Sequence, residues 1–199
     1  MRVFMVRHGE TILNKKGCYY GLTDVSLSDY GIRQAEELRV LLADQAFDRV
    51  ISSPLARARQ TALRILGDST VQVETDRRLS EQNFGVFEGM TYHEIESAYP
   101  RELAMWNESF ETYTIPDGES FADVRSRADS FADHLWKMAD STRTLLLTAH
   151  KGTLGHLLAS LLHLPLKGYW NFAVEQGCFS CLDLEDGYAI LRCLNSVTV

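Results

Sequence analysis

The segment that constrains the fold most is TLLLTA, an almost unbroken apolar run at positions 144–149 of a 199-residue chain. A strand this apolar needs cover on both faces, as strands in parallel sheets have. Helical patterns flank it, one beginning near Ser120 and one running from Lys151 until Pro165 ends it. Because buried strands joined by helices are typical of α/β proteins, the segment predicts a mostly parallel sheet covered on both faces.

Shorter strand patterns recur along the chain and alternate with helices. A hairpin is expected near the C-terminus, where two β-rich segments meet at Asp186-Gly187. The other strands are expected at positions 2–6, 48–51, 71–74 and 144–149. Because the hairpin adds at least one antiparallel strand, the expected fold is a three-layer α/β/α sandwich with a mostly parallel central sheet.

Two further helices are marked by residues at their ends. One begins near Asp29, with Ser28 as its N-cap. The other lies in SPLARARQTALRILG, where Ser53 is the expected N-cap, Pro54 takes the first helical position and Gly67 lies past the end. No repeat or linker divides the sequence, so we expect a single domain over 1–199.

Charge and hydropathy narrow the possible partners. The net charge of -7 disfavours nucleic-acid binding, which normally needs a basic surface. The apolar start is too short for a signal peptide, and the later apolar stretch is interrupted by Lys151 and three histidines. We therefore expect a cytoplasmic protein with no nucleic-acid partner and no membrane partner. The oligomeric state is left open.

The cysteines do not indicate a metal site. Cys178 and Cys181 have the spacing C-x-x-C, but no second pair completes a zinc-binding set. In a strand the two side chains would point to opposite faces. We expect free thiols in a reducing cytoplasm, and no metal.

Polar side chains follow two of the expected strands. Arg7 and His8 come directly after strand 2–6, and His150 follows strand 144–149. In open α/β sheets, ligands bind beyond the carboxyl ends of the parallel strands. The helix after His150 would also point its N-terminal N–H groups at this edge. The sequence therefore predicts an anion site there.

Two more residues are expected at the same edge. Arg57 lies about one turn into the helix after strand 48–51, and a guanidinium matches two phosphate oxygens. Glu81 follows strand 71–74 and could exchange a proton with a leaving oxygen. Taken singly, each residue would more often be structural or solvated. Their convergence on one edge favours a phosphate site.

Four segments resemble the signature of the histidine phosphatase superfamily, also called phosphoglycerate-mutase-like. They are RHGET, SSPLARARQTA, LSEQNFGVFEG and TAHKGT. The resemblance implies a metal-independent phosphomonoesterase without a cofactor, acting on a small-molecule phosphomonoester. His8 would be the nucleophile and form a phosphohistidine, and Glu81 would be the proton donor. The implied phosphate-binding residues are Arg7, Arg57, His150, Asn14 and Thr11, and Gly21 and Lys151 would lie near the substrate.

The C-terminal segment and the helix near Ser120 resemble the α-ribazole phosphatases within that superfamily. This implies hydrolysis of α-ribazole 5′-phosphate or adenosylcobalamin 5′-phosphate. A broad-specificity or sugar-phosphate phosphatase is the alternative, and the short segment between Glu81 and His150 disfavours a mutase. A helical, substrate-facing insert is expected at 82–118, over the site. Its aromatic residues could stack on a base or simply pack a lid.

Overall fold

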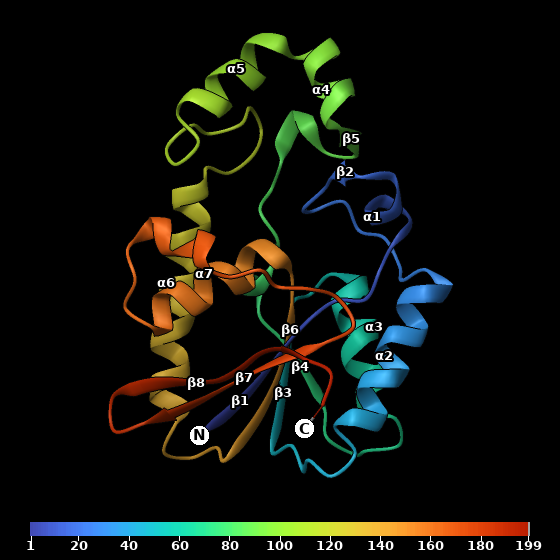
Figure 1. The fold of residues 1–199 in the computed structure, drawn as a ribbon, viewed down its shortest axis with the longest axis vertical. Coiled ribbons are helices and arrows are strands. Elements are labelled where there is room, and N and C mark those ends of the chain that lie inside the picture. Colours follow the sequence, from blue (N-terminus) through green and yellow to red (C-terminus); the bar gives the residue numbers. More distant parts are fainter. Residues whose placement is uncertain (199) are drawn as a thin grey trace.

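The computed structural model describes residues 1–198, whose centre is a six-stranded sheet (Figure 1). The strands are β1 (Arg2–Arg7), β3 (Arg49–Ser52), β4 (Val73–Thr75), β6 (Thr144–Ala149), β7 (Phe179–Glu185) and β8 (Tyr188–Ser196). Their order in the sheet is β4-β3-β6-β1-β7-β8. The first four are parallel, whereas β7 runs antiparallel to β1 and β8 runs antiparallel to β7. The predicted sheet and its antiparallel hairpin are confirmed.

Two pairs of helices cover the sheet. The pair α2 (Asp29–Leu41) and α3 (Ala56–Leu66) packs on one face, and α6 (Phe121–Met138) and α7 (Lys151–Leu161) pack on the other (Figure 1). This is the three-layer sandwich expected from the sequence. Among residues 1–198, no helix is both long enough and apolar enough to cross a bilayer.

Alternate residues of β1 contribute to two different cores. Val3 and Met5 pack in the core that contains α6 and α7, whereas Phe4 and Val6 pack in the core that contains α2 and α3. Burial on both faces explains why this strand and TLLLTA lack a polar face. The only polar positions left to such strands are their ends, and the ends carry the site.

A smaller lobe extends the molecule away from the sheet, and α4 (Tyr92–Ala98) and α5 (Pro100–Glu108) form its green end in Figure 1, opposite both termini. The strands β2 (Cys18–Tyr19) and β5 (Met90–Thr91) pair antiparallel and join two segments distant in sequence. A separate apolar cluster, which includes the buried Phe87 and Trp106, holds the lobe together. The remaining elements of the chain are α1 (Ile12–Lys16), η1 (Arg77–Leu79), η2 (Gly85–Phe87) and η3 (Leu166–Asn171).

The ends of α2 and α3 differ in how well the sequence predicted them. Ser28 caps α2 as expected, its hydroxyl accepting from the backbone N–H of Gly31. α3 begins only at Ala56, so Ser53 as N-cap was wrong. The Ser53 hydroxyl lies instead 2.8 Å from Nε2 of His150. The side chain of Asp24 accepts from the Ala56 N–H at 2.7 Å, so a residue from a distant loop binds the first N–H of α3.

The end of α7 also differs from the prediction. The helix stops at Leu161, before Pro165 is reached. His163 adopts a positive φ of 55°, and Leu164 N–H donates to the carbonyl of Ala159 at 2.8 Å. His163 N–H donates to the carbonyl of Ser160. These two bonds form a Schellman motif, so backbone geometry ends the helix and Pro165 merely follows.

Candidate active site

Two histidines meet at the carboxyl ends of neighbouring strands. β1 and β6 are parallel, with Arg7 opposite Ala149 in the register. His8 and His150 therefore leave the sheet side by side, with ring centroids 5.1 Å apart. The His8 N–H also donates to the Ala149 carbonyl at 2.9 Å, which extends the ladder to the first histidine. The sheet itself thus fixes the spacing of the pair.

The tautomer of His8 is set by the backbone. Nδ1 lies 2.8 Å from the carbonyl of Gly9, which can only accept, so Nδ1 carries the proton and Nε2 keeps its lone pair. Gly9 is held close to α2, where a Cβ would lie 2.4 Å from the Gly31 carbonyl oxygen. Burial, followed by the nearby Arg57 charge, lowers the pKa of His8 to about 3. His8 is therefore a neutral imidazole at physiological pH.

His150 has the opposite tautomer. Nε of Arg57 donates to Nδ1 of His150 at 3.3 Å, so Nε2 carries the proton and donates to Oγ of Ser53 at 2.8 Å. The ring is fully buried. Burial, together with the Arg57 charge, lowers the pKa of His150 well below its ordinary value. This second histidine presents a neutral N–H donor at the strand end.

Arg57 is a fully buried cation fixed by backbone carbonyls. Nη1 donates to the carbonyl of Thr23 at 3.0 Å, and Nη2 donates to the carbonyl of Gly21 at 2.7 Å. Its guanidinium carbon also lies 4.6 Å from the centroid of the Tyr20 ring. The residue is the second of α3, whereas the sequence placed it about one turn into the helix. Gly21 thus meets the site through its carbonyl, which orients Arg57.

Arg7 is less fully bonded than Arg57. Nη1 donates to the carbonyl of Val174 at 3.0 Å. Nε is buried and has no hydrogen-bond partner among the described residues. An unpartnered buried guanidinium nitrogen costs free energy unless a ligand accepts from it. Arg7 therefore retains capacity for an anion at the end of β1.

Thr11 and Asn14 form one network beside the arginines. Thr11 caps α1, and its backbone N–H donates to Oδ1 of Asn14 at 3.1 Å. Tyr20 donates to the same oxygen at 2.9 Å, and so does Nε2 of Gln176 at 3.0 Å. Because the Tyr20 ring also lies against Arg57, it couples this network to the buried cation. Tyr20 and Gln176 were not among the predicted site residues, and local sequence gives no sign of this long-range bonding.

Glu81 lies at the N-terminus of α7. Its carboxylate accepts from the backbone N–H groups of Gly152 at 3.0 Å and Thr153 at 3.2 Å, and from its neighbour Gln82 at 3.0 Å. The N–H groups of Gly152 and Thr153 are free helix-end donors, which favour an acidic partner. Lys151, the exposed first residue of α7, lines the same cavity as Glu81. The acid and His150 are therefore positioned by one helix start.

Glu88 organises the loop that holds Arg57, and sequence reasoning missed it. Its carboxylate accepts from the backbone N–H groups of Gly21 at 2.8 Å, Leu22 at 3.1 Å and Thr23 at 3.0 Å. It also accepts from the Thr23 hydroxyl and the Phe84 N–H. Since Gly21 and Thr23 in turn bind Arg57, Glu88 acts on the cation through this loop. Its position within LSEQNFGVFEG was the only available signal.

A cavity of about 340 Å³ adjoins Glu81. We call it the aromatic cavity, because most of its wall consists of rings from the smaller lobe, α6 and η3. Its lining residues are Tyr19, Glu81, Gln82, Phe84, Trp106, Phe110, Phe121, Val124, Lys151, Gly152, His156, Tyr169 and Trp170.

No group of three or more histidine, cysteine, aspartate or glutamate side chains in residues 1–198 has a metal-binding arrangement. The four cysteines are free thiols, and Cys181 faces Cys193 across β7 and β8. The positive charge at the strand ends comes instead from Arg7 and Arg57.

Fold and site together are those of a phosphoryl-transfer hydrolase built on an α/β sandwich. Residues 3–197 match the histidine phosphatase superfamily (branch 1), and the protein belongs to that superfamily. It is a phosphatase of this class, as the four signature segments indicated.

Individual relatives cover nearly the whole chain. The adenosylcobalamin/alpha-ribazole phosphatase of Salmonella typhimurium is 37% identical, over 100% of this chain and 98% of that protein. Phosphoserine phosphatase 1 of Hydrogenobacter thermophilus is 29% identical, over 98% of this chain and 92% of that protein. The crystal structure of the alpha-ribazole phosphatase from Shigella flexneri has a TM-score of 0.95 at 34% identity, covering 100% of this chain and 98% of that one.

Proposed function

We propose that this protein hydrolyses phosphate monoesters through a phosphohistidine on His8, and that its substrate is α-ribazole 5′-phosphate or adenosylcobalamin 5′-phosphate. The observation that carries the chemistry is the buried, neutral His8, whose Nδ1 is tied to the Gly9 carbonyl. This leaves Nε2 as a nucleophile with its lone pair available. The substrate assignment is supported by the 37% identity to the Salmonella enzyme over the full chain.

In the first step, Nε2 of His8 attacks phosphorus, and the bond from phosphorus to the substrate oxygen breaks. Glu81 in its protonated form gives its proton to that leaving oxygen, so an alcohol departs rather than an alkoxide. In the second step, the Glu81 carboxylate takes a proton from water as the water oxygen attacks phosphorus. The N–P bond breaks, inorganic phosphate leaves, and both residues return to their starting states.

Charge stabilisation falls to the residues at the strand ends. Arg57 and Arg7 supply two positive charges for the equatorial oxygens of the transferring group, and His150 supplies its one N–H, on Nε2, by exchanging Ser53 for one of these oxygens. Asn14 and Thr11 complete the phosphate site at its edge. Because backbone carbonyls fix the two arginines before substrate arrives, their charges need little reorganisation in the transition state. We propose that the reaction needs no metal, since two arginines provide the charge a metal would otherwise bring.

The leaving group is placed on the side of Glu81. We propose that positions 82–118 form a substrate-facing insert within a single domain, and that Lys151 adds positive charge at its rim. Gly21 contributes to the phosphate site indirectly, because its carbonyl accepts from Arg57 and orients that side chain. A small-molecule substrate in the cytoplasm, with no nucleic-acid partner, accords with the net charge of -7.

A kcat/KM panel in EDTA tests the proposal. The substrates are α-ribazole 5′-phosphate, phosphoserine, 3-phosphoglycerate, fructose 2,6-bisphosphate and p-nitrophenyl phosphate. We expect a preference of about a hundredfold for α-ribazole 5′-phosphate, equivalent to about 2.7 kcal/mol of transition-state binding. A flat profile would refute the substrate and leave a broad-specificity phosphatase. A strict metal requirement would refute the mechanism.

Phosphoserine is the second candidate substrate. It is favoured by the 29% identity to phosphoserine phosphatase 1 across 98% of this chain. The same panel separates the two, because an amino acid ester has no ring with which to fill the aromatic cavity.

A further inference from the structure

The aromatic cavity contains polar atoms that the fold leaves without partners. Nε1 of Trp106 and Nδ1 of His156 are buried and form no hydrogen bond within the described residues. The two side chains are only 6% and 1% exposed. Buried polar groups of this kind are rare in native proteins and call for an explanation, such as a missing ligand. Both residues line the same cavity, next to Glu81.

The chemistry of these two groups specifies what a ligand must offer. Indole N–H can only donate, so Trp106 requires an acceptor. Burial, followed by the charges of Arg125 and Arg127, lowers the pKa of His156 to about 3, so its ring is neutral and can donate or accept. A ring nitrogen with a free lone pair, set in a planar aromatic system, meets the requirement of one of these groups, and a hydroxyl oxygen beside the ring meets that of the other.

The surrounding rings provide surfaces for stacking. Phe121 and Trp170 are nearly parallel, at an interplanar angle of 13° with centroids 5.9 Å apart. The ring of Phe121 lies edge-on to His156 at 4.2 Å. Offset stacking and edge-to-face contacts are the arrangements that aromatic ligands favour. A flat heteroaromatic ring therefore fits this cavity better than a sugar or a carboxylate.

We infer that the aromatic cavity binds the heteroaromatic ring of the leaving group, with Trp170 as a stacking surface and His156 and Trp106 as its hydrogen-bond partners. The inference rests on the proposed function and adds to it the residues that select the substrate. A benzimidazole riboside has one unsubstituted ring nitrogen, which can accept from Nδ1 of His156, and its ribose hydroxyls offer the acceptor that Trp106 lacks. With the ring in this cavity, the phosphoester oxygen lies towards Glu81, which lines the same wall.

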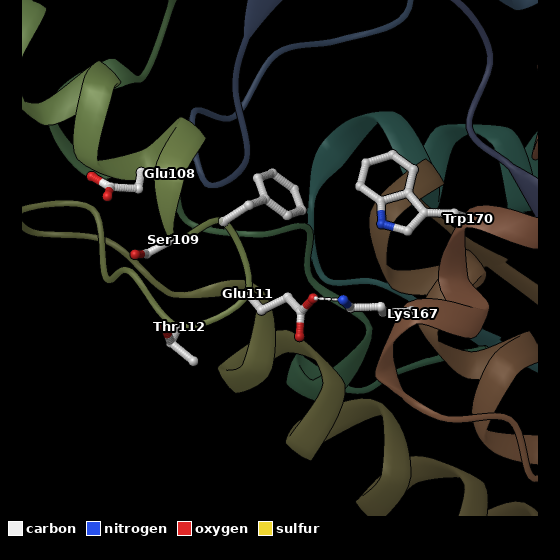
Figure 2. Close-up of a pocket in the computed structure, with 7 residues that line it drawn as sticks. Glu108, Ser109, Glu111, Thr112, Lys167 and Trp170 are labelled. Carbon is white, nitrogen blue, oxygen red and sulfur yellow. Dashed lines mark ion pairs between the residues drawn. The ribbon is translucent and has the colours of Figure 1, made fainter.

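Trp170 can be altered without disturbing a core. It is 63% exposed, and together with Phe110 it lines both the aromatic cavity and an outer groove of about 560 Å³. Figure 2 shows the groove, with Trp170 near the Lys167–Glu111 ion pair, whose nitrogen and oxygen are 3.3 Å apart. The rings of Phe110 and Trp170 separate the aromatic cavity from this groove. A large exposed indole at this place is suited to contact a ligand.

The test compares two substrates that differ only in the base: α-ribazole 5′-phosphate and ribose 5-phosphate. In Trp170→Ala, we expect the ratio of their kcat/KM values to fall about tenfold, mainly through the KM of the α-ribazole ester, as loss of one stacking surface implies. Tyr188→Ala is the matched control, because Tyr188 is also a largely exposed aromatic residue and lies on β8, outside the cavity. We expect its ratio to equal that of the wild type.

His156→Phe tests the hydrogen bond while keeping an aromatic ring. The wild type should prefer the benzimidazole riboside 5′-phosphate over the indole riboside 5′-phosphate, which lacks the ring nitrogen. The variant should reduce this preference about tenfold, the cost of one buried hydrogen bond. If both variants keep the wild-type ratios, the inference is overturned.

The design separates failure of the inference from failure of the proposed function. A large wild-type preference for α-ribazole 5′-phosphate that survives both substitutions would sustain the function and reject the cavity assignment. If the wild type has no such preference, the function fails. Inhibition of ribose 5-phosphate hydrolysis by free α-ribazole then tests the cavity assignment by itself. Weaker inhibition of Trp170→Ala than of Tyr188→Ala supports the assignment, and equal or absent inhibition rejects it.

Discussion

Oε2 of Glu81 lies 3.0 Å from the backbone nitrogen of Gly152, so the proposed acid is held by the first turn of α7. The approach is close enough that a Cβ at position 152 would lie 2.4 Å from Oε1 of Glu81. A side chain at this position must therefore displace the carboxylate. The glycine in TAHKGT provides the space in which the acid is held.

Gly152→Ala should impair catalysis without harming the fold. Alanine favours a helix by about 1 kcal/mol over glycine, and this gain offsets the loss of the Glu81 bonds at the start of α7, so thermal stability should change little. The displaced Glu81 should lower kcat for alkyl phosphates more than kcat for p-nitrophenyl phosphate, whose leaving group needs little protonation. Steady-state kinetics on both esters, with a melting curve, check this. Wild-type kinetics would show that the carboxylate need not occupy this position.

Glu81→Gln should show the same leaving-group dependence more strongly. Loss of a general acid costs about 10²–10⁴-fold in rate for a poor leaving group, and much less for p-nitrophenolate. The measurement is kcat for a series of phenyl and alkyl phosphates plotted against leaving-group pKa. A steeper slope in the variant is expected. Parallel lines for the two proteins would contradict the role of Glu81 as the acid.

His8→Ala should abolish both turnover and the covalent intermediate. Rapid quench of the wild type in alkaline detergent with ³²P-labelled substrate should trap a phosphoenzyme that is stable in base and is lost on later treatment with acid, as a phosphohistidine is. The variant should show none. His93→Ala, on the exposed surface of α4, is the matched control and should label normally. Labelling of the His8 variant would assign the nucleophile to another residue.

Glu88→Gln should weaken the phosphate site although Glu88 is not proposed to touch substrate. The amide would place an NH₂ group among N–H donors from Gly21, Leu22 and Thr23. We expect a stability loss of about 1–3 kcal/mol. We also expect a higher Ki for inorganic phosphate, because the loop that orients Arg57 is released. Glu37→Gln, exposed on α2, controls for loss of one charge, and equal Ki values in both variants would refute the role.

Stability should fall steeply in mild acid. Burial lowers the pKa values of His8 and His156 to about 3, whereas the unfolded chain binds these protons near pH 6.5. Between these limits the unfolded state holds more protons, so stability falls as pH falls, by up to about 1.4 kcal/mol per pH unit for each histidine. Urea unfolding at several pH values between 7 and 5 measures the slope. His156→Phe should reduce that slope by up to about 1.4 kcal/mol per pH unit, and an unchanged slope would mean that His156 is protonated in the fold.

The sequence was sufficient to predict the sheet and to predict which polar residues lie at its strand ends. Because β1 and β6 are buried on both faces, they can be recognised in the sequence as apolar runs. The parallel order of the strands then predicts that His8 lies beside His150, and no side-chain contact has to be known for this prediction. Local capping patterns also carried information, as Ser28 shows. What depends on neighbours in the sequence was predictable.

Residues whose partners lie far away in the sequence could not be predicted from it. Ser53 looked like an N-cap, but its hydroxyl is used by His150, which lies 97 residues away. In the sequence, Glu88 is one acid among many. Its role depends on the loop from Gly21 to Thr23, whose N–H groups reach it only in the folded protein. The aromatic residues of 82–118 were ambiguous for the same reason: Trp106 both packs in the lobe and lines the cavity.

The two histidines project from adjacent strands whose register is fixed by backbone hydrogen bonds, with Arg7 opposite Ala149. The aromatic cavity, by contrast, is walled largely by the lobe and by η3. Lengthening or exchanging those outer segments leaves the distance between the histidines unchanged. The scaffold therefore separates the parts that set selectivity from those that carry the reaction, and a new insert grafted between Gly89 and Gly118, with Glu88 kept, should change selectivity while keeping the reaction.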